Sequence, residues 1–182
     1  MKNILLILVL FLSLDQIQAQ VIYLNTNSDD IFKLDITTCE YELVVHVDFN
    51  PTDISFHPDG SLFGIDPGGR LVEIDTISGS TSELHNFNGQ TFNSLTIAGN
   101  GIFYTTGDQG EIWSYNKNTD QATYHGKMGF RATGDLTFYK GELYVAALFD
   151  QIVRIDINNP PNSSVAIDVD ISGEIFGIIS YS

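Results

Sequence analysis

The sequence predicts an all-β protein, and three observations support this prediction. A short apolar motif recurs at steps of 40, 41 and 40 residues, with copies that begin at Ile31, Leu71, Ile112 and Ile152. Dipeptides suited to two-residue hairpin loops recur with the motif, because Gly adopts positive φ freely and Asn or Asp tolerates it; they are Asp59-Gly60, Asn100-Gly101 and Lys140-Gly141. The segments before these turns alternate apolar and polar residues with period two, which is typical of β-strands.

The predicted strands follow one another in a fixed order. The first strand is expected over residues 21–26, the second begins at Ile31, and an outer strand covers residues 41–47. A full unit starts at Asp53 and contains four antiparallel strands, which we name a to d from the centre outward. Four antiparallel strands in about 40 residues have the size of a propeller blade. We therefore predict a β-propeller of four four-stranded blades; a β-sandwich is the main rival, but its loops would rarely keep so even a step.

The two ends of the chain predict how the propeller closes. The chain begins on a b strand, and residues 173–180 have the pattern of an a strand with no b strand after it. This last strand can pair with residues 21–26 and complete the first blade, which removes exposed strand edges that promote aggregation. The alternative is a partial propeller, either a piece of a larger ring or a half-ring that dimerises.

The first 19 residues have the features of a secretory signal peptide. Lys2 precedes the apolar run Ile4–Leu12, which is too short to span a bilayer, and the segment ends at Ala19. Cleavage there would leave residues 20–182 as one β-propeller domain. We expect the protein to be secreted, periplasmic or on the cell surface, with no membrane insertion once the signal peptide is removed.

The composition limits the possible partners. The chain carries 8 Lys and Arg residues against 23 Asp and Glu residues, for a formal net charge of −15 at pH 7. Nucleic acids and anionic membranes would repel such a protein, so neither is an expected partner. The single cysteine, Cys39, cannot form an internal disulfide and is expected to be a partly buried thiol. Stability must then come from packing and from closure of the sheet.

Two stretches of the chain resemble a known class of repeats. They are DISFHPDGSLFGIDPGGRLVEID, from Asp53, and GDLTFYKGELYVAALFDQIVRID, from Gly134. Both are similar to the repeats of secreted β-propellers of the NHL, YVTN and streptogramin-lyase-like type, in particular those of exported Bacteroidota proteins. The resemblance covers nearly all of residues 20–182 and implies the fold.

Polar side chains recur at the start of the predicted inner strands. Their steps are 41, 41 and 39 residues, and they are Asp53, Ser94, Asp135 and Glu174. Because inner strands crowd around the axis of a propeller, we predict that these four residues form a ligand-binding site. Carboxylates so close would repel and raise one another's pKa, so Asp53, Asp135 and Glu174 are candidates to hold Ca²⁺ or another hard cation. The alternative is that each side chain caps its own loop by accepting backbone N–H bonds.

Histidine and aromatic residues give weaker predictions. Three histidines recur at steps of 39 and 40: His46, His85 and His125. They fall on outer strands of different blades, too far apart to share one metal ion. His57 is expected to be a solvent-exposed turn residue. One unit contains aromatic residues that are candidates for a carbohydrate platform or for packing between blades: Trp113, Tyr115, Tyr124 and Phe130.

Two functions of different classes remain. The first is an exported, non-enzymatic binding or scaffold module, a monomer or dimer that recognises a protein or carbohydrate partner on one propeller face. The second is a small lyase or lactonase-like hydrolase, because some propellers with similar repeats carry a divalent metal over the channel with acids and a His base. A His within reach of Asp53 and Asp135 would favour the enzyme. Since the repeated histidines are expected on outer strands, we predict the binding module.

Overall fold

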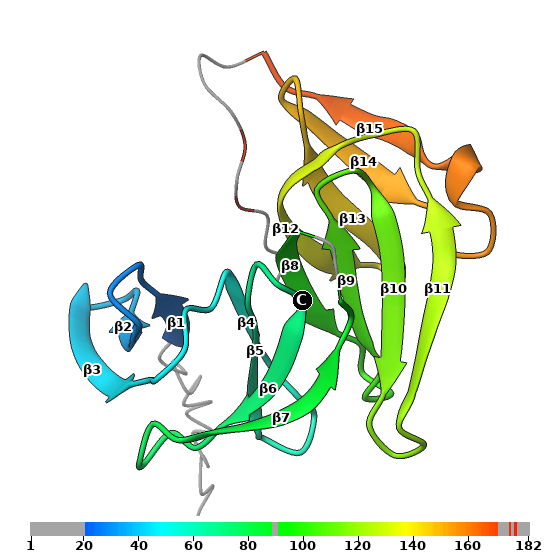
Figure 1. Cartoon of the computed structure of the whole chain (residues 1–182). Helices are drawn as coiled ribbons and strands as arrows, with labels where there is room; N and C mark the ends of the chain where they lie inside the picture. Colours follow the sequence, from blue (N-terminus) through cyan, green and yellow to red (C-terminus); the bar gives the residue numbers. More distant parts are fainter. Residues whose placement is uncertain (1–20, 89–90, 171–174, 176, 178–182) are drawn as a thin grey trace, which may run out of the picture.

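The computed structural model describes residues 21–88, 91–170, 175 and 177 of the chain. These residues form four antiparallel sheets, which follow one another as the blades of a β-propeller (Figure 1). The only helical segment among them is one 3₁₀ turn, η1 (Pro160–Asn162). The predicted fold class is therefore confirmed. No helix in the described part of the chain is long and apolar enough to cross a bilayer.

The strands pair in sequence order within each blade. The first blade contains β1 (Val21–Asn25), β2 (Asp30–Asp35) and β3 (Glu40–His46). The second contains β4 (Asp53–Phe56), β5 (Leu62–Ile65), β6 (Arg70–Ile74) and β7 (Thr81–Asn86). The third contains β8 (Phe92–Ile97), β9 (Phe103–Gly107), β10 (Glu111–Asn116) and β11 (Gln121–Lys127). The fourth contains β12 (Ala132–Tyr139), β13 (Glu142–Ala147), β14 (Gln151–Ile155) and β15 (Ser164–Asp168).

The turns use the local chemistry that the repeat predicts. Gly101 and Gly141 have φ of 81° and 82°, a region that side chains disfavour and glycine enters freely. A second recurring turn follows the third strand of a blade, where Asp75 accepts a 2.8 Å hydrogen bond from the backbone N–H of Ile77. This N–H and its neighbours hold the pKa of Asp75 below its usual value. Asp35 accepts the same bond from Thr37 one unit earlier, at 2.8 Å.

The apolar core lies between successive blades. The first and second blades bury Ile31 against Leu62, and the second and third bury Phe63 and Phe92. Between the third and fourth blades, Ile112 belongs to the buried cluster. Alternation along a strand sends neighbouring side chains to opposite faces, so Leu62 and Phe63 contribute to different clusters. Each middle blade thus has two apolar faces, and the burial of these faces stabilises the stack.

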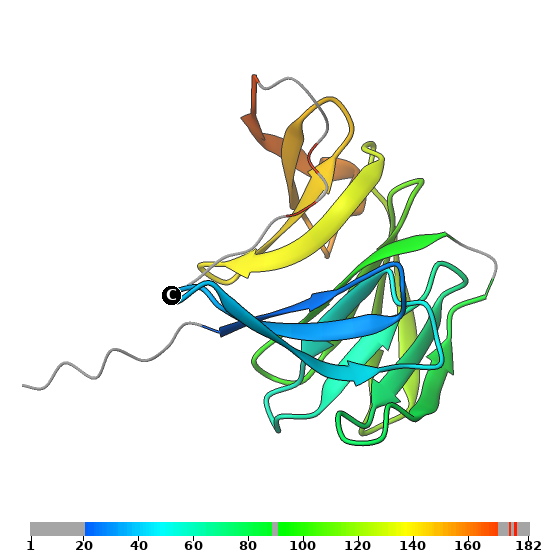
Figure 2. The same ribbon diagram turned by 90° about the vertical axis from the view of Figure 1, so that its left-hand side faces the viewer.

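The two end blades differ from the middle ones. The first sheet has three strands, and β1 is its innermost strand. The predicted closing strand, residues 173–180, lies outside the described residues except for Ile175 and Gly177. Figure 2 shows the first blade (blue to cyan) and the fourth (yellow to orange) as separate sheets. The predicted signal peptide, residues 1–19, also lies outside the described residues.

Candidate binding site at the propeller axis

The innermost described strands of all four blades border one cavity. It has a volume of about 330 Å³ and is lined by residues of β1, β4, β8 and β12. Figure 1 shows β4, β8 and β12 at the centre of the molecule, and β8 packs against both of the other two. Lining residues that carry polar side chains include Asn25, Thr52, Asp53, Thr96 and Asp135. The repeat thus brings two of the four predicted site residues to a common cavity.

Asp53 links two neighbouring blades through its carboxylate. Its Oδ1 accepts a 2.7 Å hydrogen bond from the backbone N–H of Ile54, next to it on β4. Its Oδ2 accepts a 2.6 Å hydrogen bond from the backbone N–H of Leu95 on β8. Both oxygens therefore bind main chain, as the loop-capping alternative predicted, although the second bond crosses to the next blade.

The protonation of Asp53 depends on Asp135. Burial raises the pKa of Asp53 well above its usual range, and the nearby charge of Asp135 raises it further. The N–H groups of Leu95 and Ile54 act in the opposite direction because they favour the ionised form. The two carboxyl groups thus interact across the cavity, and a cation placed near them would relieve their repulsion.

Ser94 occupies a different environment from the two acids. It is fully buried, its Oγ lies 2.6 Å from Thr106 Oγ1, and it also accepts the Thr106 backbone N–H at 3.1 Å. A register shift between Phe92 and Ser94 in the β8–β9 pair accompanies this position, and such bulges redirect side chains. The Ser94 hydroxyl is therefore engaged inside its own blade, and Ser94 does not line the axial cavity.

The fourth predicted residue, Glu174, lies outside the described residues. Gly177, which the structure does describe, lies close to Asp135: an added Cβ at Gly177 would lie 3.5 Å from Asp135 Oδ2. Gly177 follows Asp135 by 42 residues, and Leu95 follows Asp53 by the same step. In addition, Thr133 Oγ1 donates a 3.1 Å hydrogen bond to the carbonyl of Ile175. The step of 42 residues that leads from Asp53 to Leu95 therefore leads from Asp135 to Gly177, whereas the sequence prediction used a step of 39, from Asp135 to Glu174.

A complete calcium site is not formed by the described residues alone. Among them, no group of three or more His, Cys, Asp or Glu side chains is placed to hold a metal ion. Ca²⁺ binds six to eight oxygen ligands, whereas the axial cavity offers the carboxylates of Asp53 and Asp135. The cation prediction therefore depends on Glu174 or on further ligands.

The repeated histidines lie where the sequence places them. His46, His85 and His125 are on β3, β7 and β11, the outermost strands of three different blades. His125 Nε2 lies 2.7 Å from Ser114 Oγ, and burial lowers the pKa of His125. Among the described residues, no histidine lines the axial cavity.

The expectation for His57 is wrong. Its side chain is only 10% exposed, and its ring stacks on Phe103 with 5.7 Å between centroids. Its Nδ1 lies 2.9 Å from Asp59 Oδ1. The turn folds the imidazole over the aromatic core between the second and third blades, an arrangement that local sequence does not reveal.

The aromatic group of the third blade serves mainly in packing. Tyr115 is buried, and the ring of Trp113 lies 5.8 Å from that of Phe87 in the second blade. Trp113 also contacts Tyr124, at 4.7 Å between ring centroids. Because Tyr115 and Trp113 face the preceding blade, inter-blade packing explains these two residues better than a carbohydrate platform does, whereas Tyr124 is 49% exposed.

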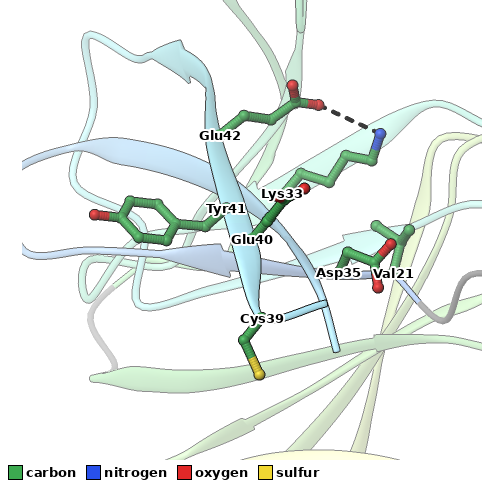
Figure 3. Close-up of a pocket in the computed structure, with 7 residues that line it drawn as sticks. All are labelled: Val21, Lys33, Asp35, Cys39, Glu40, Tyr41 and Glu42. Carbon is green, nitrogen blue, oxygen red and sulfur yellow. Dashed lines mark ion pairs between the residues drawn. The ribbon is translucent and has the colours of Figure 1, made fainter. Parts of the chain in front are cut away.

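A second depression lies on the first blade (Figure 3). Its volume is about 710 Å³, and it contains the ion pair between Lys33 Nζ and Glu42 Oε1 at 3.3 Å. Cys39 also lines it and is exposed, so the expectation of a partly buried thiol is wrong. Cys39 has φ of 60° and lies in the turn between β2 and β3, at the end of the sheet.

Comparison with known proteins supports the fold. The chain matches no protein-family model and no curated protein. A structure of a nidogen/laminin complex is similar, with 15% identity, a TM-score of 0.69 and coverage of 90% of this chain and 65% of that chain. An auxiliary nutrient binding protein from Bacteroides thetaiotaomicron has 16% identity, a TM-score of 0.59 and coverage of 80% and 38%. YCF48 bound to D1 peptide has 12% identity, a TM-score of 0.59 and coverage of 91% and 57%. The chain thus spans 38% to 65% of the length of these structures, and identities this low show the fold alone.

Proposed function

We propose that the chain is an exported, non-enzymatic binding module that recognises a cationic group of a protein partner at the axial cavity. The observation that carries this proposal is the pairing of Asp53 and Asp135 at a cavity bordered by all four blades. Export rests on the features of residues 1–19. Two of the similar structures are of protein or peptide complexes, nidogen with laminin and YCF48 with D1 peptide, which agrees with a binding role for this type of fold.

The chemistry of the cavity favours recognition over catalysis. Asp53 binds two backbone N–H groups, so its carboxyl group is held in place and both of its oxygens are engaged by the main chain. The lyase or lactonase alternative requires a His base at the channel, and the described histidines lie elsewhere. A lysine or arginine side chain that enters the cavity would offset the repulsion between the two carboxyl groups. The negative charge of the cavity would also favour a basic side chain over an acidic side chain.

The proposal can be tested with oligolysine as the probe. Binding to the wild type is compared with Asp135→Asn and with Glu83→Gln, which removes one charge from an exposed position on the outer strand β7. We expect Asp135→Asn to weaken binding several-fold more than Glu83→Gln does. Equal losses would mean that oligolysine responds only to the overall charge of −15, and the axial site would be refuted. Preferential binding of a neutral oligosaccharide would favour the carbohydrate alternative.

The cation that the site takes is a separate question. Ca²⁺ held by Asp53, Asp135 and Glu174 should raise the melting temperature of the wild type relative to EDTA, because a ligand that binds the folded state stabilises it. Asp135→Asn and Glu174→Gln should each reduce this rise, and Glu83→Gln should not. A calcium response that is unchanged in Asp135→Asn would remove the metal hypothesis and leave the amine-binding proposal intact.

A further inference from the structure

The axial cavity has a second polar layer beside its two carboxyl groups. Ser55, Thr96 and Thr137 also line it, and they belong to β4, β8 and β12, the strands at the centre of Figure 1. Each lies two residues beyond position 53, 94 or 135, a step that returns a side chain to the same side of its strand. Two residues advance a strand by about 6.6 Å. The cavity therefore has a carboxyl layer and a hydroxyl layer one such step apart along the inner strands.

Two of the lining hydroxyl groups are not used by the fold. Those of Ser55 and Thr96 form no hydrogen bond within the described part of the chain. In contrast, Thr52 Oγ1 donates to main-chain carbonyls at 3.0 and 3.2 Å, and Ser94 Oγ lies 2.6 Å from Thr106 Oγ1. A hydroxyl oxygen accepts hydrogen bonds through two lone pairs, so Ser55 and Thr96 offer the cavity acceptors that the chain itself does not occupy.

Much of the remaining lining is apolar. Leu95 and Leu136 border the cavity and are 3% and 5% exposed, and Tyr23, Leu24 and Ile54 border it as well. Long basic side chains bury their methylene stems along apolar surface and keep the charged head among polar groups. A cavity of about 330 Å³ with oxygens in two layers and leucine side chains beside them therefore suits an unbranched alkyl chain that ends in a cation.

The arrangement of the oxygens favours an ammonium head group. The acceptors belong to different blades and surround the axis, and an ammonium has three donors that diverge from one atom. With acceptors about 2.9 Å away on either side, its nitrogen bridges about 5.8 Å, which is close to the step between the two layers. A guanidinium is planar and matches both oxygens of one carboxylate. In Asp53, however, each oxygen already accepts a main-chain N–H.

We propose that the axial cavity selects the primary ammonium group of a lysine side chain of the partner over an arginine side chain. This inference rests on the proposed function, because Asp53 and Asp135 supply the negative charge. The ammonium lies between the two layers and donates to these carboxyl groups on one side and to Ser55 and Thr96 on the other. Its methylene groups pack against apolar lining such as Leu95. A quaternary ammonium has the same charge but no N–H donor, so the hydroxyl layer cannot recognise it.

The test compares three peptides of equal length and equal charge: oligolysine, oligoarginine and oligolysine trimethylated at every Nζ. Their ends are blocked, so that only side chains carry charge, and binding to the full chain is measured by calorimetry at one ionic strength. The overall charge of −15 attracts all three peptides alike, and differences among them report on the head group. We expect oligolysine to bind at least about five-fold more tightly than either other peptide, the effect of one hydrogen bond.

Two variants test the hydroxyl layer itself. Thr96→Val removes the hydroxyl group and keeps the shape of the side chain, and Ser55→Ala removes a hydroxyl group from another blade. Each should reduce the preference for oligolysine over its trimethylated form by about five-fold. The matched control is Thr123→Val, the same substitution at an exposed position on the outer strand β11, and it should keep the full preference. Circular dichroism melting shows whether each variant is folded, and two variants in different blades keep the test independent of the stability of one.

The outcomes separate this inference from the proposed function. Equal affinities for the three peptides, with Asp135→Asn still weakening all of them more than Glu83→Gln does, would refute lysine selectivity and leave the axial cation site intact. Losses in Asp135→Asn no larger than those in Glu83→Gln would refute both. Tighter binding of oligoarginine would overturn the inference. A preference for oligolysine that persists in both Thr96→Val and Ser55→Ala would also overturn it, because the hydroxyl layer would not be its cause.

Discussion

Phe63→Ala tests whether the second and third blades are held together by the aromatic core. Phe63 on β5 is fully buried, and its ring lies 4.9 Å from that of Phe103 and 5.9 Å from that of His57. Burial of a phenylalanine side chain stabilises a protein by about 1.5–3 kcal/mol, and the cavity left behind adds to the loss. Together they give an expected loss of about 3–5 kcal/mol in the free energy of unfolding. For a chain of this length, 4 kcal/mol corresponds to about 8–16 °C in melting temperature.

The assay is urea unfolding at one fixed protein concentration, followed by the fluorescence of the only tryptophan, Trp113. Trp113 packs against Phe87 between the same two blades, so it reports on their separation. The control is Phe149→Ala, an identical substitution at a side chain that is 79% exposed, and it should change stability by no more than about 0.5 kcal/mol. A loss below about 1 kcal/mol for Phe63→Ala, or equal losses for both variants, would refute the inter-blade core.

Three further predictions concern backbone and ionisable groups. Gly79→Ala should destabilise the protein more than Gly141→Ala. Both glycines have positive φ, 77° and 82°, but a Cβ added at Gly79 would collide with a main-chain carbonyl at the end of β3, whereas a Cβ added at Gly141 meets open space. Equal midpoints of urea unfolding for the two variants would contradict this. Asp135→Asn removes a charge that raises the pKa of Asp53. A raised folded-state pKa means that stability falls as pH rises above the usual aspartate range, so the variant should lose less stability than the wild type on going from acidic to neutral pH. Burial, together with Asp120, raises the pKa of Tyr115 to about 12. Stability should then fall as pH rises from about 10 towards 12, and a spectrophotometric titration in which all tyrosines ionise near pH 10 would disprove the buried phenol.

The strands and turns could be predicted from sequence because their causes are local. The period-two alternation before each hairpin and the glycines at positive φ, such as Gly101 and Gly141, act within a few residues. The repeat then extended these local signals to the whole chain. It placed the first strand at residues 21–26 and the outer strand at 41–47, and β1 and β3 lie within one residue of these bounds.

The candidate site was only partly predictable. Asp53 and Asp135 could be brought together because equivalent positions of a repeat lie at equivalent distances from the propeller axis. Ser94 has the same place in the repeat, but the β8–β9 pair has a register shift there. The Ser94 hydroxyl bonds to Thr106 of its own blade instead of lining the cavity. His57 looked like a solvent-exposed turn residue, and it is mostly buried because its ring packs on Phe103 of the next blade. These outcomes depend on contacts between segments 12 to 46 residues apart, which no local pattern encodes.

The sequence by itself determined that each blade is a small sheet with apolar residues on both faces, since alternation and the 40-residue period are properties of the chain. Only the tertiary structure decided which of these faces are covered. Leu62 and Ile22 occupy equivalent positions, yet Leu62 is buried beneath a preceding blade and Ile22 is only partly buried. Burial is a property of a residue and its neighbour together, so which faces are covered is decided only when the blades are assembled.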